Sequence, residues 1–275
     1  MATQAFSPVP QKTTWSETST SGPCALADLM IWRGVGNNQI NLSAMPGDIG
    51  KWELGQTTKA SPGAAFFNGL SWIAWIGTNK HLNVTTTADP SDKVTLGETS
   101  GHPSDVDDQG VALAAFNGDL YLAWAGTSIL KPTLNVIRSR DGRQWRDKVT
   151  FDETSDDRPA LVAFNSYLYL AWSGRDSKGH LNLMSSSDGH NFGNKQTLEF
   201  RAIAGPALAD FRGRLCLAWP EDSHLALAAS PNGVDNWKTV RFDESTYKSV
   251  ALSVIGSNLV YCWTGTDSRL NFMNV

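Results

Sequence analysis

Acidic and amide side chains that recur beside hydroxyl groups are the residues of this sequence best placed for chemistry. Each is followed by Thr or Ser at the end of one β segment of a repeat, and they are Glu17, Gln56, Glu98, Glu153 and, displaced by one residue, Glu244. Carboxylates accept hydrogen bonds and hydroxyls share them, so a ring of both suits the hydroxyl groups of a neutral sugar. The alternative is that Glu-Thr-Ser fixes a turn between segments, and its recurrence favours this structural role.

Aromatic and imidazole side chains recur in the same way. Six tryptophans close corresponding segments, at Trp32, Trp75, Trp124, Trp172, Trp219 and Trp263. They end strands that we expect to be covered on both sides, so packing is favoured for most of them, with Trp75, Trp124 and Trp172 kept as candidate ligand contacts. His81, His180 and His224 precede another segment at equivalent places, which spreads them out and predicts no metal site. His81 and His180 are candidate sugar contacts, although solvated loop positions are the commoner outcome.

Two cations, Arg158 and Lys248, stand at the start of the innermost segment of their repeats, where an anionic group could meet them. Asparagines at the centre of another segment also need partners, because an unpaired buried amide costs about 1–3 kcal/mol. The partner is either backbone of the neighbouring repeat or a ligand hydroxyl in a cleft between repeats. These asparagines are Asn41, Asn83, Asn135, Asn182 and Asn271.

A repeat of 43 to 49 residues, counted between the six tryptophans, must position all of these side chains. Residues 114–124 (AAFNGDLYLAW) recur at 162–172 and, more loosely, at 209–219. Each copy divides into four short β segments, A to D: A is apolar, B ends at the tryptophan, C carries the asparagine in most copies, and D opens with a lysine. A period of this length indicates a propeller or a solenoid.

The two ends of the chain decide between these architectures. The last copy stops after segment C at Val275, whereas residues 12–19 match the D segment at 148–155 with no A, B or C before them. A solenoid caps its terminal units, but two ends that make up one unit close a ring and remove exposed sheet edges. We therefore predict an all-β, six-bladed β-propeller with four-stranded antiparallel blades, a single domain over residues 1–275 in which residues 10–20 complete the sixth blade.

The turns between segments C and D carry a family resemblance. Residues 139–145 (SRDGRQW) and 186–192 (SSDGHNF) place an acidic side chain to accept N–H groups of its own turn, a glycine for positive φ and an aromatic residue to pack on the blade. These turns resemble the Asp box of sialidases and related propellers, with a looser copy at 230–237. The residue usually found between Asp and Gly is missing here.

The sialidase resemblance implies an active site that this chain does not match. Sialidases use three arginines, a tyrosine with a partner glutamate, and an acid/base aspartate. Their Arg-Ile-Pro signature is absent, and Arg158-Pro159 is the nearest match. We therefore predict no catalytic residues. The same repeat is similar to non-catalytic sugar-binding propellers, which implies ligand sites between blades or on the face that carries the D-to-A and B-to-C loops.

Composition excludes several other classes of protein. The 23 Lys and Arg against 27 Asp and Glu give a net charge of −4, so no basic field exists to bind nucleic acid. No apolar run approaches the roughly 18 residues of a membrane span. Three cysteines at unrelated places predict buried thiols, and we expect no cofactor. The start of the sequence shows no signal peptide, which predicts cytoplasmic residence, with non-classical release and oligomerisation left open.

Three functional hypotheses remain open from the sequence. The leading one is a non-catalytic protein that binds glycans or glycoconjugates through weak, repeated sites whose avidity supplies the affinity. The alternative is an enzyme acting on a glycoside or another small molecule in an axial pocket, with Glu221, Asp222 and the loop glutamates as acid/base groups. The third is a scaffold for a protein partner, which needs no pocket.

Overall fold

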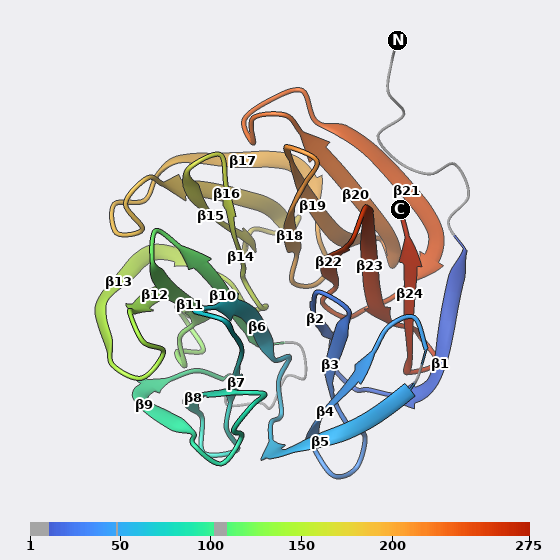
Figure 1. Cartoon of the computed structure of the whole chain (residues 1–275). Helices are drawn as coiled ribbons and strands as arrows, with labels where there is room; N and C mark the ends of the chain where they lie inside the picture. Colours follow the sequence, from blue (N-terminus) through green and yellow to red (C-terminus); the bar gives the residue numbers. More distant parts are fainter. Residues whose placement is uncertain (1–10, 48, 102–108) are drawn as a thin grey trace.

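The computed structural model describes residues 11–47, 49–101 and 109–275, which form six four-stranded antiparallel sheets arranged as a ring (Figure 1). In every blade the strands follow one another as a meander, from the innermost strand at the axis to the outermost at the rim. The predicted six-bladed β-propeller is therefore confirmed. Short, mostly apolar segments are separated by Gly and Asn turns, which is the pattern of such hairpins.

Blades 1 to 3 follow in chain order from the first described loop. Blade 1 contains β2 (Cys24–Leu26), β3 (Leu29–Arg33), β4 (Gln39–Ala44) and β5 (Ile49–Thr57). Blade 2 contains β6 (Gly63–Phe67), β7 (Leu70–Ile76), β8 (His81–Thr86) and β9 (Val94–Thr99). Blade 3 contains β10 (Val111–Phe116), β11 (Asp119–Ala125), β12 (Thr133–Ser139) and β13 (Trp145–Thr154).

Blades 4 to 6 complete the ring. Blade 4 contains β14 (Ala160–Phe164), β15 (Tyr167–Ser173), β16 (His180–Ser186) and β17 (Gly193–Arg201). Blade 5 contains β18 (Ala207–Phe211), β19 (Arg214–Glu221), β20 (His224–Ser230) and β21 (Lys238–Ser245). Blade 6 contains β22 (Ala251–Ile255), β23 (Asn258–Thr264), β24 (Arg269–Asn274) and, from the other end of the chain, β1 (Lys12–Thr18).

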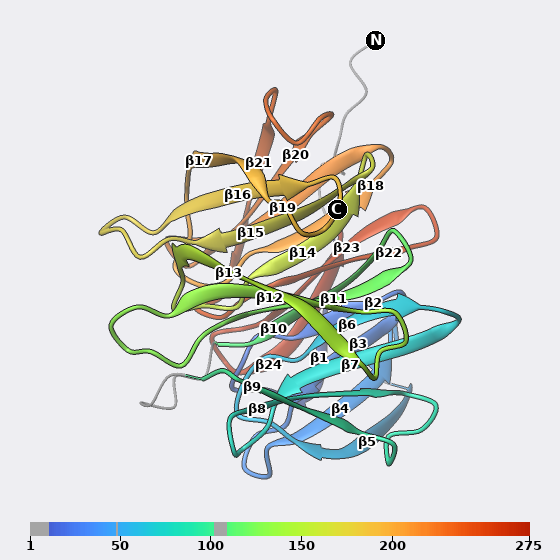
Figure 2. The ribbon, with the colours of Figure 1, turned by 90° about the vertical axis from the view of Figure 1, so that its left-hand side faces the viewer.

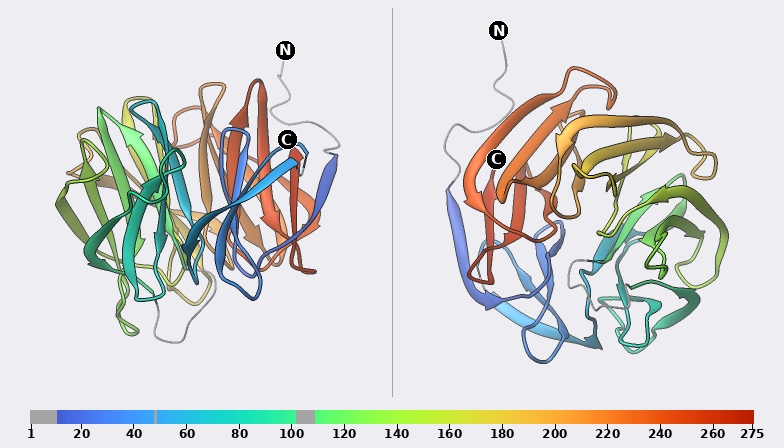
Figure 3. Two further views of the ribbon diagram at one scale, coloured as in Figure 1. Left: turned by 60° about the horizontal axis from the view of Figure 1, so that its bottom comes forward. Right: turned by 180° about the vertical axis from the view of Figure 1, so that it is seen from behind.

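The sixth blade joins the two ends of the chain, as the repeat predicts. Strand β1 pairs antiparallel with β24, with Thr14 opposite Asn271, and the front and rear views place the N-terminal strand beside the C-terminal ones (Figures 1 and 3). The Thr14 hydroxyl donates a hydrogen bond to the Asn271 side chain at 2.6 Å. Trp15 packs edge-on against Trp32 of blade 1, with ring centroids 5.9 Å apart. The first described strand therefore closes the ring through hydrogen bonds and through packing.

The hydrophobic core lies between blades. The described residues form six buried clusters, each drawn from two consecutive blades. Because side chains alternate along a strand, β11 sends Leu120, Leu122 and Trp124 toward blade 2, while Tyr121 and Ala123 pack toward blade 4. All six repeated tryptophans are at most 2% exposed. Packing between blades explains them, as the sequence indicates for most.

The turns between the third and fourth strands have the predicted local geometry. Asp141 Oδ1 accepts the backbone N–H groups of Arg143 and Gln144, both at 2.8 Å, and Gly142 adopts a φ of +74°. Asp188 does the same in blade 4 and Asn232 in blade 5. The outermost strands of blades 1, 3 and 4 begin before the predicted lysine, because residues just after the turn already pair with the third strand, as Trp145 does with Ser139.

The ring has two different faces, seen edge-on in Figure 2. We call one the loop face: it carries the loops between second and third strands and the crossovers from each fourth strand to the next blade. The opposite turn face carries the hairpins between first and second strands and the Asp-Gly turns. This assignment follows from the meander order of each sheet.

Candidate functional site

The four glutamates predicted as ligand contacts lie at blade junctions, where each forms an ion pair with a lysine of the next blade. The N–O distances are 2.6 Å for Glu17–Lys51, 2.6 Å for Glu153–Lys195 and 2.7 Å for Glu244–Lys12, and Glu98 pairs with Lys148 in the same way. The glutamate side chains are 23–30% exposed and the lysine side chains 37–43% exposed. The pairs therefore stand at the solvent edge of each junction.

Three of these lysines, together with Lys93, lie over the repeated tryptophans of their own blades. The ammonium nitrogens are 5.4–6.0 Å from the indole centroids for Lys51–Trp32, Lys93–Trp75, Lys148–Trp124 and Lys195–Trp172. The candidate contacts Trp75, Trp124 and Trp172 are 1%, 1% and 0% exposed. A sugar ring would have to displace a lysine to stack on one of these indoles.

The junction between blades 4 and 5 departs from this pattern as a unit. Phe200 takes the place of the glutamate and stacks on Trp219, with ring centroids 4.6 Å apart and an interplanar angle of 21°. An aromatic ring thus covers the tryptophan of blade 5, whereas a lysine covers the tryptophan in blades 1 to 4.

The repeated asparagines find partners inside their own blades, which corrects the expectation of a neighbouring-blade or ligand partner. The amide of Asn135, for example, donates to the carbonyl of Thr133 at 2.8 Å, and its oxygen accepts from the Thr150 hydroxyl at 2.7 Å. Asn83, Asn182 and Asn271 repeat both bonds. Asn41 lies opposite Glu53 rather than a threonine, and its Oδ1 has no hydrogen-bond partner among the described residues.

Five of the six fourth strands are followed by a hydroxyl residue, which fixes the crossover to the next blade, and blade 4 has Ala202 at this position. The Thr58 hydroxyl accepts the N–H of Ala60 at 3.1 Å and donates to the carbonyl of Ile76 at 2.9 Å. Thr246 makes the same pair of bonds, with Lys248 and Thr264. The hydroxyl of the Glu-Thr-Ser motif therefore has a structural role, while the glutamate remains at the junction surface.

A groove opens between blades 2 and 3 beside one of the glutamate pairs. It has a volume of about 230 Å³ and is lined by β9, including Leu96 and Glu98, and by Ile137, Arg143 and Trp145 of blade 3. Arg143 also forms an ion pair with Asp92. The hydrogen bond from the Arg143 guanidinium lowers the pKa of the Asp92 carboxyl. The groove thus brings together a carboxylate, a guanidinium, an indole and two aliphatic side chains.

A second and larger groove lies on blade 4 where the turn of blade 5 approaches it. Its volume is about 570 Å³, and its lining includes Tyr167, Tyr169, Lys195, Gln196 and Val234. The Tyr169 hydroxyl donates to the Asn232 carbonyl at 3.2 Å, while Tyr167 stays 40% exposed at the rim. Tyr169 packs in the core between blades 4 and 5. The groove itself was not identified from the sequence.

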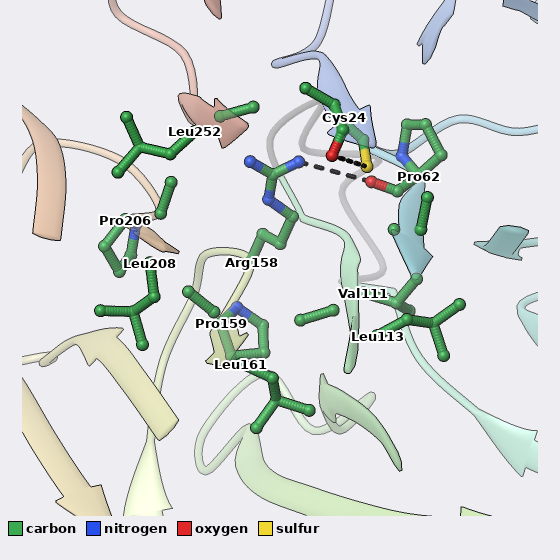
Figure 4. A pocket seen from close by; sticks show the side chains of 17 residues that line it. Cys24, Pro62, Val111, Leu113, Arg158, Pro159, Leu161, Pro206, Leu208 and Leu252 are labelled. Atoms are coloured by element: carbon green, nitrogen blue, oxygen red, sulfur yellow. Dashed lines mark hydrogen bonds between the residues drawn. The ribbon is translucent and has the colours of Figure 1, made fainter. Parts of the chain in front are cut away.

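The axis of the ring is nearly filled, and Arg158 crosses it (Figure 4). The Arg158 side chain is buried, and its guanidinium donates to the carbonyls of Pro23 at 2.9 Å, Pro62 at 3.4 Å and Val250. The remaining axial cavity has a volume of about 70 Å³. Arg158 therefore lies where the sequence predicts a channel cation, but it ties blade 4 to blades 1, 2 and 6.

The axial cavity is mostly apolar. Its described lining is made of Pro, Gly, Ala, Val and Leu residues with Arg158 and Cys24, and no described lining residue is a carboxylate. Burial raises the pKa of the Cys24 thiol to about 11, so this thiol stays protonated at neutral pH. Residues 102–108, which include three aspartates, lie outside the described part of the chain.

The remaining sequence candidates are spread over the loop face. His81 Nδ1 lies 3.0 Å from the Leu96 carbonyl oxygen, and His180 Nδ1 lies 2.9 Å from Asp176 Oδ1. Glu221 is held by Arg241, whose Nε donates to Glu221 Oε2 at 2.7 Å, and the next residue, Asp222, lies in a tight turn with a φ of +49°. These residues belong to separate blades and do not form one constellation.

Among the described residues, no group of three or more His, Cys, Asp or Glu side chains is arranged to hold a metal ion. They also contain no helix with the length and apolar character needed to cross a membrane.

Several solved structures are similar to this chain over most of its length. The Aleuria aurantia lectin in complex with α-methyl-L-fucoside matches with a TM-score of 0.67 and 11% identity, over 93% of this chain and 92% of the lectin. An α-L-arabinofuranosidase from Fusarium graminearum matches with a TM-score of 0.65 and 12% identity, over 94% and 97%. A neuraminidase-like protein of a little yellow-shouldered bat isolate matches with a TM-score of 0.61 and 7% identity, over 96% and 99%.

At these identities the likeness establishes the fold alone, a six-bladed β-propeller. No protein-family model matches the sequence, and no curated protein matches it.

Sequence reasoning did not assign Lys51, Lys148 and Lys195 to the candidate site. Each opens its D segment, but the glutamate that it pairs with belongs to the preceding blade. The sequence gives no signal for this pairing, because Lys93 and Lys238 are retained in the blades that follow Gln56 and Phe200. Arg143 and Trp145 were seen only as turn residues.

Proposed function

We propose that this propeller binds carbohydrate in the junctions between consecutive blades. The groove between blades 2 and 3 carries the proposal, because Glu98, Arg143 and Trp145 line one hollow of about 230 Å³. A carboxylate accepts hydrogen bonds from sugar hydroxyls, a guanidinium donates them, and an indole covers the C–H face of the ring. Pockets for drug-sized ligands span roughly 300–1,000 Å³, so this groove suits a single sugar residue.

The repeated ion pairs support several sites of the same kind. Each ammonium has three donors and each carboxylate several acceptor sites, so a pair joined by one hydrogen bond keeps capacity for a ligand. Two neighbouring sugar hydroxyls match this arrangement, one donating to the carboxylate and the other accepting from the ammonium. Four junctions carry the pair, and weak sites repeated around a ring gain affinity through multivalency.

One further observation supports the class of ligand, and a second concerns the turns of the repeat. The fold is shared with a lectin whose structure holds α-methyl-L-fucoside, which makes neutral fucosides the first ligands to test. The turns at Asp141, Asp188 and Asn232 have the geometry expected of Asp boxes, and we assign them to that type. Such turns are structural and favour neither binding nor catalysis.

The enzyme alternative finds little support at the axis. A glycosidase places two carboxylates about 5–10 Å apart on either side of the bond that it cleaves. The described lining of the 70 Å³ axial cavity includes no carboxylate, and Glu221 is paired with Arg241 on the loop face. Turnover of chromogenic glycosides that is lost in Glu221→Gln would restore this alternative.

The proposal is tested by titrating methyl α-L-fucoside and a panel of neutral glycans into the protein by calorimetry. Glu98→Gln removes one charge-assisted hydrogen bond, so we expect about tenfold weaker binding at that groove. Its melting temperature should stay within about 4 °C, because an exposed ion pair contributes at most about 1 kcal/mol. Replacing all four junction glutamates by glutamine should abolish binding.

Glu199→Gln is the matched control, because Glu199 is an exposed carboxylate on the outermost strand of blade 4 with no ion pair among the described residues. It should bind as the wild type does. The proposal fails if the wild-type protein binds none of the glycans at high concentration. It also fails if the fourfold variant binds them unchanged.

A further inference from the structure

We infer a second site, outside the repeat, on the loop face of blade 6, suited to a saccharide that carries a negative charge. It is a pocket of about 250 Å³ formed by three segments far apart in the sequence, residues 19–20, 247–248 and 264–268. The inference deepens the proposed function, on which it rests for the saccharide nature of the ligand. It differs in location, charge and number of sites.

The pocket is held in shape by the hydroxyl bonds of two crossovers. The Thr246 hydroxyl accepts the N–H of Lys248 at 3.0 Å and donates to the carbonyl of Thr264 at 2.6 Å. The Thr264 hydroxyl in turn donates to the carbonyl of Ser21 at 2.8 Å. These bonds attach the crossover that contains Tyr247 and Lys248 to the end of β23, and they attach the end of β23 to the crossover that follows β1. The site is therefore largely preformed, which reduces the entropy cost of binding.

Lys248 gives the pocket a positive charge. Its side chain is partly buried, and it has no ion pair within the described part of the chain. The two glutamates on the adjoining strands are engaged elsewhere, Glu17 with Lys51 and Glu244 with Lys12. Asp267, on the loop itself, lies 3.9 Å from the Arg269 guanidinium. An anionic ligand group would supply the partner that Lys248 lacks.

The rest of the lining suits a sugar ring with hydroxyls. Thr20 Oγ1 is buried without a hydrogen-bond partner among the described residues, and Thr266 and Ser268 add further polar groups. A buried hydroxyl without a partner is costly, so a ligand hydroxyl at this place is favourable. Tyr247 is 63% exposed at the rim, where its ring offers a face for stacking.

The other blades show that the repeat does not require this combination. At the other described crossovers, the two residues that correspond to Tyr247-Lys248 are Thr20-Ser21, Lys59-Ala60, Asp156-Asp157 and Ile203-Ala204. Only blade 6, of these five, combines an aromatic residue with a cation. In blade 4 the position of Lys248 is taken by Asp157, which accepts a hydrogen bond from Ser173 at 2.5 Å. The same crossover turn thus contains an acidic residue in blade 4 and a basic residue in blade 6. Because the turn forms with either charge, its structure does not require Tyr247 and Lys248.

The test follows Tyr247 directly by fluorine NMR of the full chain labelled with 3-fluorotyrosine. Tyr247→Phe identifies the resonance. Methyl β-D-glucuronide, methyl β-D-glucoside and sodium acetate are then titrated separately. We expect a saturable shift with the glucuronide at about tenfold lower concentration than with the glucoside or acetate, as one charge-assisted hydrogen bond provides. Lys248→Gln should remove the preference for the glucuronide over the glucoside. Lys178→Gln, an exposed lysine on the same face, should leave it unchanged.

Several outcomes would overturn the inference. No shift with the glucuronide, or the same preference in Lys248→Gln, removes the site. An equal effect of acetate would make it a simple carboxylate site and would refute the saccharide. The proposed function is read out separately, since Glu98→Gln should weaken neutral-glycan binding without moving the Tyr247 titration. Loss of one result without the other therefore identifies which of the two proposals has failed.

Discussion

In blades 1, 2, 4 and 6 the asparagine of the third strand requires the glycine that lies two residues after the repeated tryptophan. A Cβ on Gly77 would lie 2.7 Å from the Asn83 amide nitrogen, and a Cβ on Gly34 would lie as close to Asn41. The amide is held there by its bond to the carbonyl two residues earlier. Blade 5 has neither member of the pair, with Ala226 in place of asparagine. Two departures that look independent in the sequence are therefore one structural change.

Gly77→Ala should consequently destabilise the protein by about 1–3 kcal/mol through overpacking. The free energy of unfolding, measured with urea, checks this value. Asn83→Ala in the same molecule should recover part of the loss, because it removes the atom that the new methyl group meets. Gly126→Ala is the matched control in blade 3, where a longer loop leaves the nearest atom 3.5 Å from the added Cβ. Equal losses at Gly77 and Gly126 would contradict the explanation.

At the scale of elements, the Asp-Gly turns join each blade to the one before it. A Cβ on Gly142 would lie 2.2 Å from the Trp72 ring, and one on Gly189 would lie 2.0 Å from the Tyr121 hydroxyl. An aromatic residue three positions before the repeated tryptophan occurs in blades 2, 3 and 4, and the turn glycine occurs in blades 3, 4 and 5. The turn is therefore a packing device between neighbouring blades.

These turns also predict a pH dependence of stability. The N–H groups of Gln144 and Arg143 lower the pKa of Asp141, and those of Asn191 and His190 lower the pKa of Asp188. A lowered carboxyl pKa stabilises the folded state above the unfolded value of about 3.9, and the contribution is lost as the pH falls through the folded value. We therefore expect the melting temperature to decrease when the pH is lowered below about 4.

Asn232 fills the same role in blade 5 without a charge, so asparagine retains the turn. Between pH 4 and pH 2.5, the melting temperature of the double variant Asp141→Asn, Asp188→Asn should decrease less than that of the wild type. This pH window is set by the carboxyl pKa of about 3.9 in the unfolded state. Calorimetric scans across this range provide the measurement. Parallel curves for the two proteins would show that these carboxylates do not contribute.

The elements were predictable from the sequence to a greater degree than the site. The blades could be predicted from the short apolar segments and the spacing of the tryptophans. Their closure into a ring could be predicted from the match between residues 12–19 and 148–155. The glutamate partners were not predictable, because Lys148 and Glu98 meet only when two blades pack. The pocket around Tyr247 was missed for the same reason: its three segments belong to both ends of the chain. Tertiary contacts between repeats have no signature in the period of one repeat.

At the scale of the whole molecule, two contacts hold the ring as one unit. Arg158 reaches across the axis from blade 4 to carbonyls of blades 1, 2 and 6. Strand β1 ties the start of the chain to the last blade, and Trp15, 4% exposed, packs against both blade 6 and blade 1. No disulfide closes the ring, since all three cysteines are free. Stability should therefore depend strongly on the first strand.

Deletion of residues 1–18 should lower the melting temperature sharply and favour aggregation, because it removes Trp15 from the core and leaves β24 as an unpaired sheet edge. Trp15→Ala keeps the strand and should cost about 3–5 kcal/mol, which gives a milder variant if the truncated chain does not fold. A synthetic peptide of residues 11–20 should bind the open edge and raise the melting temperature of the truncated protein, as an added strand does in β-augmentation. A truncated chain that unfolds at the wild-type temperature would show that the ring does not need its first strand, and the sixth blade would then be stable with three.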